Sequence, residues 1–516
     1  VVEMTNTGQM TGALNGIRVF DLTAAGVGPW AAMLLAGLGA DVIHVEGEGR
    51  SSDHVPPHLH GTSCLYIAAN RNKRSVLLDL KDAADREKAY GLLRHCDIFV
   101  ENFRAGVVER LGFGYEQVRQ FRPDIVYCSL NGWGKTGPMV DEVANDPAVQ
   151  AFSGWASING MPRGPGQMYR HLALLDVTTA SYGALAILGA ILHRKRTGEG
   201  QYIEVTMLGS ALSVQATRLA EYFVTGQQPP NRGSASSNTA PNEAFLCADR
   251  QYLAVGVVQE EQWPRFCRAI GRPELADDAQ FRTSADRVRH RDVLSGLLMD
   301  VFKQRHTRWW MKRLTEERVP HARFMEFEDL RFHPQVIEND FLRPFQTRHW
   351  GPVYFGGWPW KSATAVEPMR PGPLPGEHTT QVLAEFGLDN PPSRDNSPAR
   401  AGGAEARASM SLLRGYKVLE LGQGVSAPYC GLLLGEMGAE VVKVEPLVGD
   451  RTRHLGPFVD GGESGLFKTL NLHKRSVSID WTTSQGRELV RLLAGHRRQL
   501  LERVERDQYY DEISKE

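Results

Sequence analysis

The sequence predicts an α/β protein with a large domain built on a parallel sheet, a smaller second domain, and a partial repeat of the large domain near the C-terminus. Two observations predict this. Strand-like and helix-like segments alternate through the first 130 residues, and motifs from that region recur in the same order after residue 411. Alternation of strand and helix leads to a parallel sheet with right-handed crossovers. The 516 residues also exceed the length of one ordinary domain.

The N-terminal region supplies the elements of the predicted sheet. Short apolar runs rich in β-branched residues predict strands, and runs of helical composition between them predict helices. The predicted strands cover residues 17–22, 41–45, 75–80, 97–100 and 125–130, and the predicted helices cover 30–38 and 82–94.

A glycine-rich loop and a long helix follow this region. The loop covers residues 131–170, and the helix begins after Asp176. The helix ends in the basic run HRKR (193–196), and Gly198 follows. Cations in a last turn and a glycine just beyond it are signals of a helix C-terminus. Residues 201–207 then predict another strand.

The remaining chain divides by composition. Residues 1–215 form the predicted large domain, and residues 216–334 form a smaller domain that is richer in Trp, Arg and Gln, with a helix over 292–304. Residues 389–410 are rich in Pro, Ser, Ala and Gly, which is typical of a linker.

Residues 411–500 are predicted to form the partial second copy. GIRVFDL (16–22) matches GYKVLEL (415–421), LGADVIHVE (38–46) matches MGAEVVKVE (437–445), and NKRSV (72–76) matches HKRSV (473–477). Matches that recur in order indicate an internal repeat. The second copy stops near Gly495, so it has no counterpart of the segment that contains Asp176.

Bulk composition argues against several classes of partner. The net charge is −1 and the isoelectric point is about 7.0, so we expect neither nucleic acid nor a membrane surface as a partner. The six cysteines form no C-x-x-C motif, which favours reduced thiols, a cytoplasmic location and no metal site. The N-terminus lacks the charged and apolar regions of a signal peptide. The longest apolar run, residues 183–192, is shorter than a membrane span.

Several ordered motifs resemble one enzyme family. The N-terminal strand–helix–strand segment, NRNKRSVLLDLK (70–81), VENFRAGVVERLGF (100–113), LNGWGKTGP (130–138), HRKRTGEGQ (193–201) and GEHTTQVL (376–383) are similar to signatures of class III coenzyme A (CoA) transferases, the CaiB/BaiF family. The resemblance covers about residues 14–388 and 411–495. It implies a Rossmann-like large domain, a return of residues 335–388 to that domain, and an interlocked homodimer.

The resemblance also implies a chemistry. Such an enzyme moves CoA from an acyl-CoA to a carboxylic acid, with CoA thioesters as substrates and no tightly bound cofactor. The family's nucleophilic aspartate matches Asp176, which would pass through an anhydride and an aspartyl-CoA thioester. A carboxylate is a weak nucleophile in water, so it has to be positioned and partly desolvated. The alternative for Asp176 is a simple helix N-cap, a position that Asp favours.

The resemblance places CoA on the N-terminal region. Basic side chains suit its phosphates, and a backbone without large side chains allows close approach. The candidate residues are Ala25, Gly26, Lys73, Arg74, Arg104, Arg110 and Leu111. The alternative for each basic residue is a solvated surface charge. Gly26 stands where formyl-CoA transferases carry glutamine, which argues against oxalate and formate as substrates.

Two other functions stay open at this level. An α-methylacyl-CoA racemase of the same fold uses a histidine where this chain has Asn145, although Asp146 could still exchange a proton. The second open function is that of a protein that binds CoA without catalysing a reaction. The truncated second copy suggests it, because that copy could supply only a docking surface. A NAD-dependent dehydrogenase would need the G-x-G-x-x-G fingerprint, which the sequence lacks. The sequence does not identify the donor and acceptor acids.

Overall fold

The computed structural model describes residues 12–47, 55–170, 173–347, 349–362, 368–389, 411–458 and 462–495. The chain forms two compact units. The larger unit comprises residues 1–153, 169–226 and 343–516, and the smaller unit comprises residues 154–168 and 227–342.

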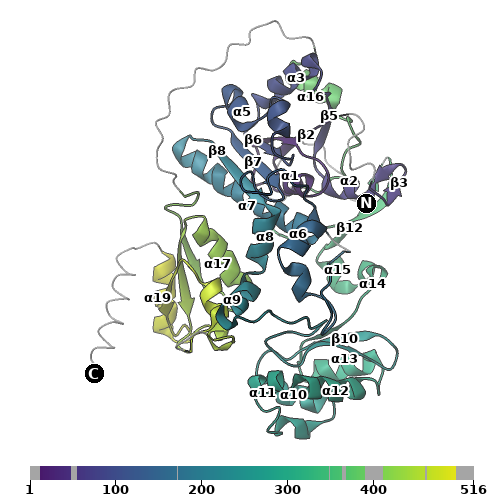
Figure 1. Ribbon diagram of the computed structural model, residues 1–516, viewed down its shortest axis with the longest axis vertical. Helices are drawn as coiled ribbons and strands as arrows, with labels where there is room; N and C mark the ends of the chain where they lie inside the picture. The colour runs from purple at the N-terminus through teal and green to yellow at the C-terminus, as the bar shows by residue number, and fades with distance from the viewer. Residues whose placement is uncertain are drawn as a thin grey trace, which may run out of the picture. The chain divides into compact units, whose positions relative to one another are not determined.

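A six-stranded parallel sheet organises the larger unit (Figure 1). Its strand order is β5-β2-β1-β6-β7-β8, with every neighbouring pair parallel. The strands are β1 (Arg18–Leu22), β2 (Asp41–Glu46), β5 (Arg74–Leu77), β6 (Ile98–Glu101), β7 (Val126–Asn131) and β8 (Gln201–Thr206). The order reverses direction between β1 and β6. In open α/β sheets, ligands bind at the carboxyl ends of the strands near such a reversal.

Helices cover both faces of this sheet. One core cluster packs α1 (Val27–Gly37) and α7 (Leu174–Thr197) against one face. A second cluster packs α3 (Ala83–Leu93), α5 (Tyr115–Phe121) and α16 (Thr379–Glu385) against the other. Because α16 lies in the segment after residue 343, the chain returns to the larger unit after crossing the smaller one.

Shorter elements complete the larger unit's first module. The helices are α2 (Cys64–Ala69), α4 (Val107–Arg110), α6 (Asp146–Phe152), α8 (Met207–Val214) and α9 (Ala216–Thr225), and the hairpins are β3 (His58–Leu59) with β4 (Thr62–Ser63) and β12 (Leu342–Thr347) with β13 (Gly351–Gly356).

Helix α7 is the longest helix in the described residues. By length and composition it could cross a membrane, but half of its most apolar window is buried inside the protein, as in a core helix. It packs closely: a Cβ added at Gly183 would lie 2.8 Å from a Leu130 methyl carbon. The helix begins at Leu174 with Ala173 as its N-cap. Asp176 therefore lies inside the first turn, so its interpretation as an N-cap is wrong.

The smaller unit has an antiparallel sheet with helices. The sheet order is β11-β10-β9, and its core contains Trp263, Phe266 and Phe302. The strands are β9 (Asn242–Leu246), β10 (Tyr252–Gly256) and β11 (His321–Arg323), and the helices are η2 (Trp155–Ile158), α10 (Gln262–Ala269), η3 (Pro273–Ala276), α11 (Ser284–Arg289), α12 (Arg291–Phe302), α13 (Thr307–Glu316), α14 (Phe327–Arg331) and α15 (Pro334–Glu338).

The boundaries of the smaller unit differ from the predicted 216–334. The unit's main segment starts at Gln227, because α9 packs against α8 and α18 of the larger unit. It also takes in residues 154–168 from the glycine-rich loop. The return to the larger unit comes at Arg343. Composition alone does not show which side of a boundary a helix packs on.

Residues 411–495 form a second, smaller sheet within the larger unit. Its order is β14-β15-β16, with both pairs parallel, which corresponds to the order β1-β2-β5. The elements are β14 (Lys417–Glu420), α17 (Ser426–Glu436), β15 (Glu440–Glu445), η4 (Arg451–His454), α18 (Gly465–Leu470), β16 (Lys474–Ser478) and α19 (Ser484–Ala494). Linker residues 390–410 and the predicted end at 496–500 lie outside the described residues.

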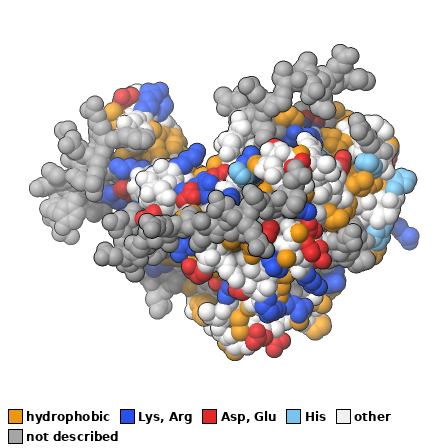
Figure 2. All heavy atoms as spheres, turned by 90° about the horizontal axis from the view of Figure 1, so that it is seen from above, with side chains coloured by type: hydrophobic (Ala, Val, Ile, Leu, Met, Phe, Trp, Pro, Cys, Tyr) orange, Lys and Arg blue, Asp and Glu red, His pale blue; other side chains and the backbone are white. Residues whose placement is uncertain are grey.

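The described surface carries mixed charge. On the face that Figure 2 shows, blue Lys and Arg side chains lie among red Asp and Glu side chains and hydrophobic patches. No single-sign field covers the described part of that face, in keeping with the net charge of −1.

Candidate functional site

A cavity at the carboxyl ends of the central strands contains Asp176. Its volume is about 370 Å³. Its walls come from the loop after β1, the segments after β6 and β7, and the first turns of α6 and α7. Four predicted site residues meet here: Asp176, Ala25, Gly26 and Arg104.

The Asp176 carboxyl is held in an environment that disfavours its charge. Its pKa is raised from 3.8 to about 7, first by burial and second by the charge of the nearby Asp146 carboxylate. A helix N-terminus favours negative charge, but at this position burial prevails. Near neutral pH the group is therefore divided between its protonated and ionised forms, and the ionised form is poorly solvated.

Gly26 leaves room for this carboxyl. A Cβ added at Gly26 would lie 3.0 Å from Asp176 Oδ2 and 3.2 Å from its Cγ. Ala25 has a positive φ of 64°, which turns the chain at this point. Asn102 fixes the loop from the other side: its Oδ1 accepts from the Ala24 N–H at 2.8 Å, and its Nδ2 donates to the Ala24 carbonyl at 2.7 Å.

Asp146 and Gln150 of α6 support the start of α7. Asp146 is buried, and its Oδ2 accepts from the Leu175 N–H at 2.8 Å. The fully buried Gln150 donates from Nε2 to Asp146 Oδ1 and to the Tyr169 carbonyl, and its Oε1 accepts from the Tyr169 N–H at 2.7 Å. These bonds fix α6 to Tyr169, which precedes α7, and to Leu175 in the first turn of α7. Sequence reasoning considered Asp146 only as a racemase acid and missed Gln150, which no motif marks.

Asn145 has a structural position. Its side chain accepts from the Ala148 N–H at 3.0 Å and caps α6. No histidine is among the described residues that line the Asp176 cavity. The histidine-based proton transfer of the racemase alternative therefore has no counterpart in this cavity.

A second cavity lies at the carboxyl ends of β1, β2 and β5. Its volume is about 340 Å³, and Leu22, Val45 and Leu111 contribute apolar walls. Arg110, next to Leu111 at the end of α4, is exposed. Neither Arg110 nor the exposed Arg104 forms an ion pair with any residue in the described part of the chain. Both guanidinium groups are therefore available to an external anion.

Lys73 is placed differently from its prediction. Its side chain is fully buried, and its Nζ bonds Asp21 Oδ2 and Asn70 Oδ1, each at 2.8 Å. His44 Nδ1 approaches the same Asp21 oxygen at 3.0 Å. Burial alone would raise the pKa of Asp21, but Lys73 and His44 hold it well below its usual range. The Lys73 charge is neutralised inside the protein, so the predicted phosphate contact does not fit this position.

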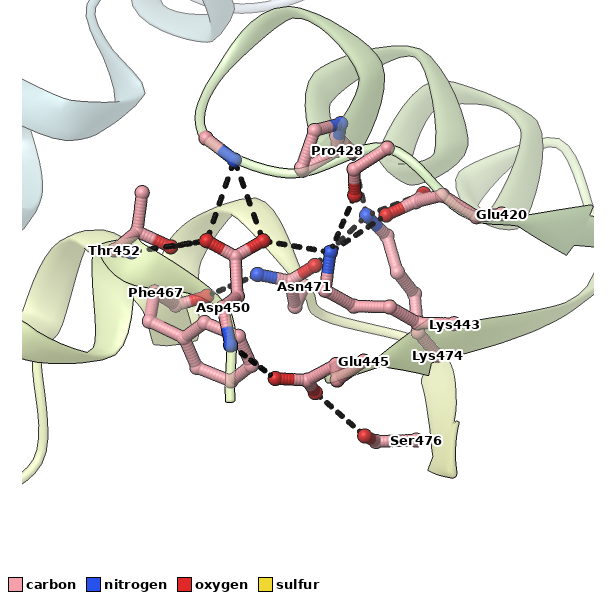
Figure 3. A network of polar contacts seen from close by, with 12 residues as sticks. Glu420, Pro428, Lys443, Glu445, Asp450, Thr452, Phe467, Asn471, Lys474 and Ser476 are labelled. Carbon is pink, nitrogen blue, oxygen red and sulfur yellow. Dashed lines mark hydrogen bonds and ion pairs between the residues drawn. The ribbon is translucent and has the colours of Figure 1, made fainter. Parts of the chain in front are cut away.

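The second sheet repeats this arrangement (Figure 3). Lys474, the sequence counterpart of Lys73, bonds Glu420 Oε2 at 2.9 Å, Asn471 Oδ1 at 3.0 Å and the Pro428 carbonyl at 2.6 Å. Lys443 lies beside it, fully buried between Glu420 and Asp450. A lysine at this position is therefore buried and ion-paired in both segments.

Arg74 also lies away from the Asp176 cavity. Its Nη2 pairs with Asp41 Oδ2 at 2.6 Å, and its Nη1 pairs with Glu385. These groups lie near the amino ends of β2 and β5, at the opposite edge of the sheet from Asp176. Arg74 thus connects the sheet to α16.

Comparisons with known proteins show which family the chain resembles. The model of CoA-transferase family III matches residues 14–379 and again 413–496. The human succinyl-CoA:glutarate CoA-transferase is 31% identical over 72% of this chain and 85% of its own length. The succinyl-CoA:mesaconate CoA-transferase of Haloarcula marismortui is 32% identical over 75% of this chain and 99% of its own.

A solved structure matches over the same extent. A CaiB/BaiF family protein from Brucella suis is 29% identical, with a TM-score of 0.66 over 73% of this chain and 100% of its own. These relatives align over most of their length with about three quarters of this chain. The chain therefore belongs to CoA-transferase family III and is an enzyme of that class.

Proposed function

We propose that the enzyme transfers CoA through covalent intermediates on Asp176. One observation carries the proposal: a carboxyl group with a pKa raised to about 7 lies in a cavity at the carboxyl ends of the sheet, against a glycine that leaves space beside it. Perturbed pKa values of this kind gather at catalytic sites.

The reaction balances without water or a net proton. An Asp176 oxygen attacks the thioester carbonyl, the C–S bond breaks, and an anhydride and CoA thiolate form. The thiolate attacks Asp176 Cγ, which releases the first acid and leaves an aspartyl-CoA thioester. The carboxylate of the second acid attacks this thioester and expels the thiolate again. The thiolate then attacks the acyl carbonyl of the new anhydride, which forms the product thioester and restores Asp176.

The surroundings of Asp176 suit these steps. Burial removes water from the carboxylate and so increases its reactivity. The N-cap of α1 is Gly26, and the first N–H groups of a helix have no partner inside the helix. Because Gly26 lies beside Asp176, the start of α1 is placed to stabilise negative charge on a tetrahedral oxygen. We assign the CoA phosphates to Arg104 and Arg110, and the adjacent cavity at Leu111 to the adenine end of CoA.

Trapping tests the proposal directly. The protein is incubated with acyl-CoAs, quenched with hydroxylamine, and digested for mass spectrometry. We expect a hydroxamate on Asp176 that is absent in Asp176→Asn and present in the control Asp300→Asn, whose carboxyl is 82% exposed in the smaller unit. Absence of the adduct with every acyl-CoA, while CoA still binds, would overturn the assignment.

We further propose a dicarboxylic acid as acceptor. The similar relatives carry names with glutarate, mesaconate or oxalate as acid partner, all dicarboxylic acids. Gly26 disfavours oxalate, which leaves the longer acids. The test is a competition panel in which glutarate and mesaconate are compared with butyrate and crotonate. A monocarboxylate with a higher kcat/KM than its matched dicarboxylate would contradict this choice.

Assembly and location remain proposals of the same kind. The family assignment supports a homodimer with a Rossmann-like large domain, and the free state of all six cysteines suits a reducing cytoplasm. Light scattering after gel filtration measures the assembly, and a mass of one chain at micromolar concentration would contradict the dimer.

A further inference from the structure

The smaller unit contains a cavity that the proposed reaction does not use. Its volume is about 750 Å³. Residues of two segments, 157–164 and 228–232, line it together with Asp292 of α12. All of these residues belong to the smaller unit, so the cavity is complete within that unit.

Hydrogen bonds hold the two segments together. The Gly233 N–H donates to the Gly160 carbonyl at 2.8 Å, and Asn231 Nδ2 donates to the Gly164 carbonyl at 2.8 Å. Gln228 Nε2 donates to Ser157 Oγ at 2.9 Å. These bonds connect the two segments and fix the backbone on both sides of residue 232.

Arg232 is the unsatisfied group in this wall. Its Nε is buried and has no hydrogen-bond acceptor. Within the described residues its guanidinium forms no ion pair either, although the side chain is half-buried. Leaving a buried N–H of a charged group without an acceptor is costly, and proteins rarely do so without a reason. An acceptor from outside the chain would remove that cost.

A second guanidinium reinforces the positive charge. Arg291 is buried; burial lowers its pKa, and the charge of Arg232 lowers it further. Arg291 donates to the carbonyls of Ser236 and Ser237, which are uncharged. Arg291 thus engages its two terminal nitrogens, but its Nε, like that of Arg232, is buried without an acceptor. The charges of Glu243 and Asp292 act on Arg291 in the opposite direction to Arg232. The pair therefore attracts an anion.

The walls select the kind of anion. Pro162, Pro229 and Pro230 give the cavity apolar surface that suits a carbon chain. Asp292 adds a negative charge, which opposes a phosphate dianion more strongly than a single carboxylate. Arg163, whose side chain is 90% exposed, lies 3.7 Å from Asp292 and can turn toward a ligand.

We propose that Arg232, with Arg163 at the rim, binds the carboxylate of a small organic acid in this cavity. A guanidinium can donate two parallel hydrogen bonds to one carboxylate. The site goes beyond the reaction proposed for Asp176 and does not depend on it, because the inference rests on contacts within the smaller unit alone.

Residue-specific protection tests the site in the full chain. Phenylglyoxal modifies accessible arginines, and peptide mapping by mass spectrometry reports the rate at Arg232. We expect butyrate to slow this modification and butyramide, its neutral analogue, to leave it unchanged. Calorimetric titration with butyrate should show binding that is weakened about tenfold or more in Arg232→Gln. Arg289→Gln, at an exposed arginine of the same unit, should bind like the wild type.

The outcomes separate the alternatives. Equal modification of Arg232 with and without butyrate would overturn the proposal. Protection by inorganic phosphate but not by butyrate would overturn the carboxylate assignment. Because protection is measured on the wild-type protein, the test holds even where Arg232→Gln folds poorly, and Arg232→Lys serves as a second variant with reduced rather than absent butyrate affinity.

Discussion

Replacing Asp146 by Asn should shift the pH dependence of the reaction. Asp176 has a pKa raised to about 7, by burial first and by the Asp146 carboxylate second. In the wild type, kcat/KM should fall about tenfold for each pH unit below 7, because only the ionised Asp176 attacks. Asp146→Asn removes the second cause and keeps the first. The acidic limb of the profile should therefore move to lower pH.

The measurement is kcat/KM for an acyl-CoA donor between pH 5.5 and 8.5. Loss of one Asp146 hydrogen bond at Leu175 or Gln150 will lower stability, so thermal unfolding is followed in parallel. Glu142→Gln is the matched control, since Glu142 lines the same cavity but does not shift the pKa of Asp176. A flat wild-type profile, or an acidic limb that stays in place in Asp146→Asn, would refute the reasoning.

Four further outcomes follow from the contacts described above. Asp176→Asn should become more stable relative to the wild type as pH rises from about 4 to 7, by up to roughly 4 kcal/mol. One pKa unit is worth about 1.4 kcal/mol, and the wild type must ionise a half-buried acid with a raised pKa over that range. Urea unfolding at pH 5 and 8 checks this, and an equal stability difference at both pH values would contradict it. Gly26→Ala should lower kcat about tenfold, because the new Cβ would press on the Asp176 carboxyl. Its melting temperature should change little, because the φ of −100° at this position suits alanine. A Gly26→Ala variant with the kinetics of the wild type would count against the close approach. Lys73→Ala should cost roughly 3–5 kcal/mol of unfolding free energy, because it removes the lysine partner of the buried Asp21 and leaves His44 as the neighbouring charge. Arg104→Ala should keep its stability and raise the KM for acyl-CoA about fivefold. The reverse pattern would restore Lys73 as a ligand residue.

Strong local patterns carried the prediction of the main sheet. The run before Asp21 is apolar and β-branched, and the run that ends at Glu46 is also apolar, so each had one reasonable interpretation as a strand. The sheet of the smaller unit was missed. Its strand β11 (His321–Arg323) has three residues, too few to show a period, and depends on pairing with β10.

The candidate site was predictable where the signal was a position in a motif. Asp176 and Gly26 were found in this way, and the structure brings them together. Charge alone misled at Lys73, because its partner Asp21 is 52 positions away and the sequence does not show that the two meet in the core. Gln150 gave no signal, since a buried amide and an exposed one look the same in a sequence.

Strand β14 lies at one edge of the sheet formed by residues 411–495. Strand β1 has neighbours on both sides, β2 and β6, whereas β14 pairs only with β15 among the described strands. One row of its backbone groups is therefore a template on which a foreign strand could assemble. The strand has four residues, and the exposed Lys417 stands at its start, a combination that discourages such growth. A longer or less charged β14 would lack both of these protections and would present an edge more open to pairing with another chain.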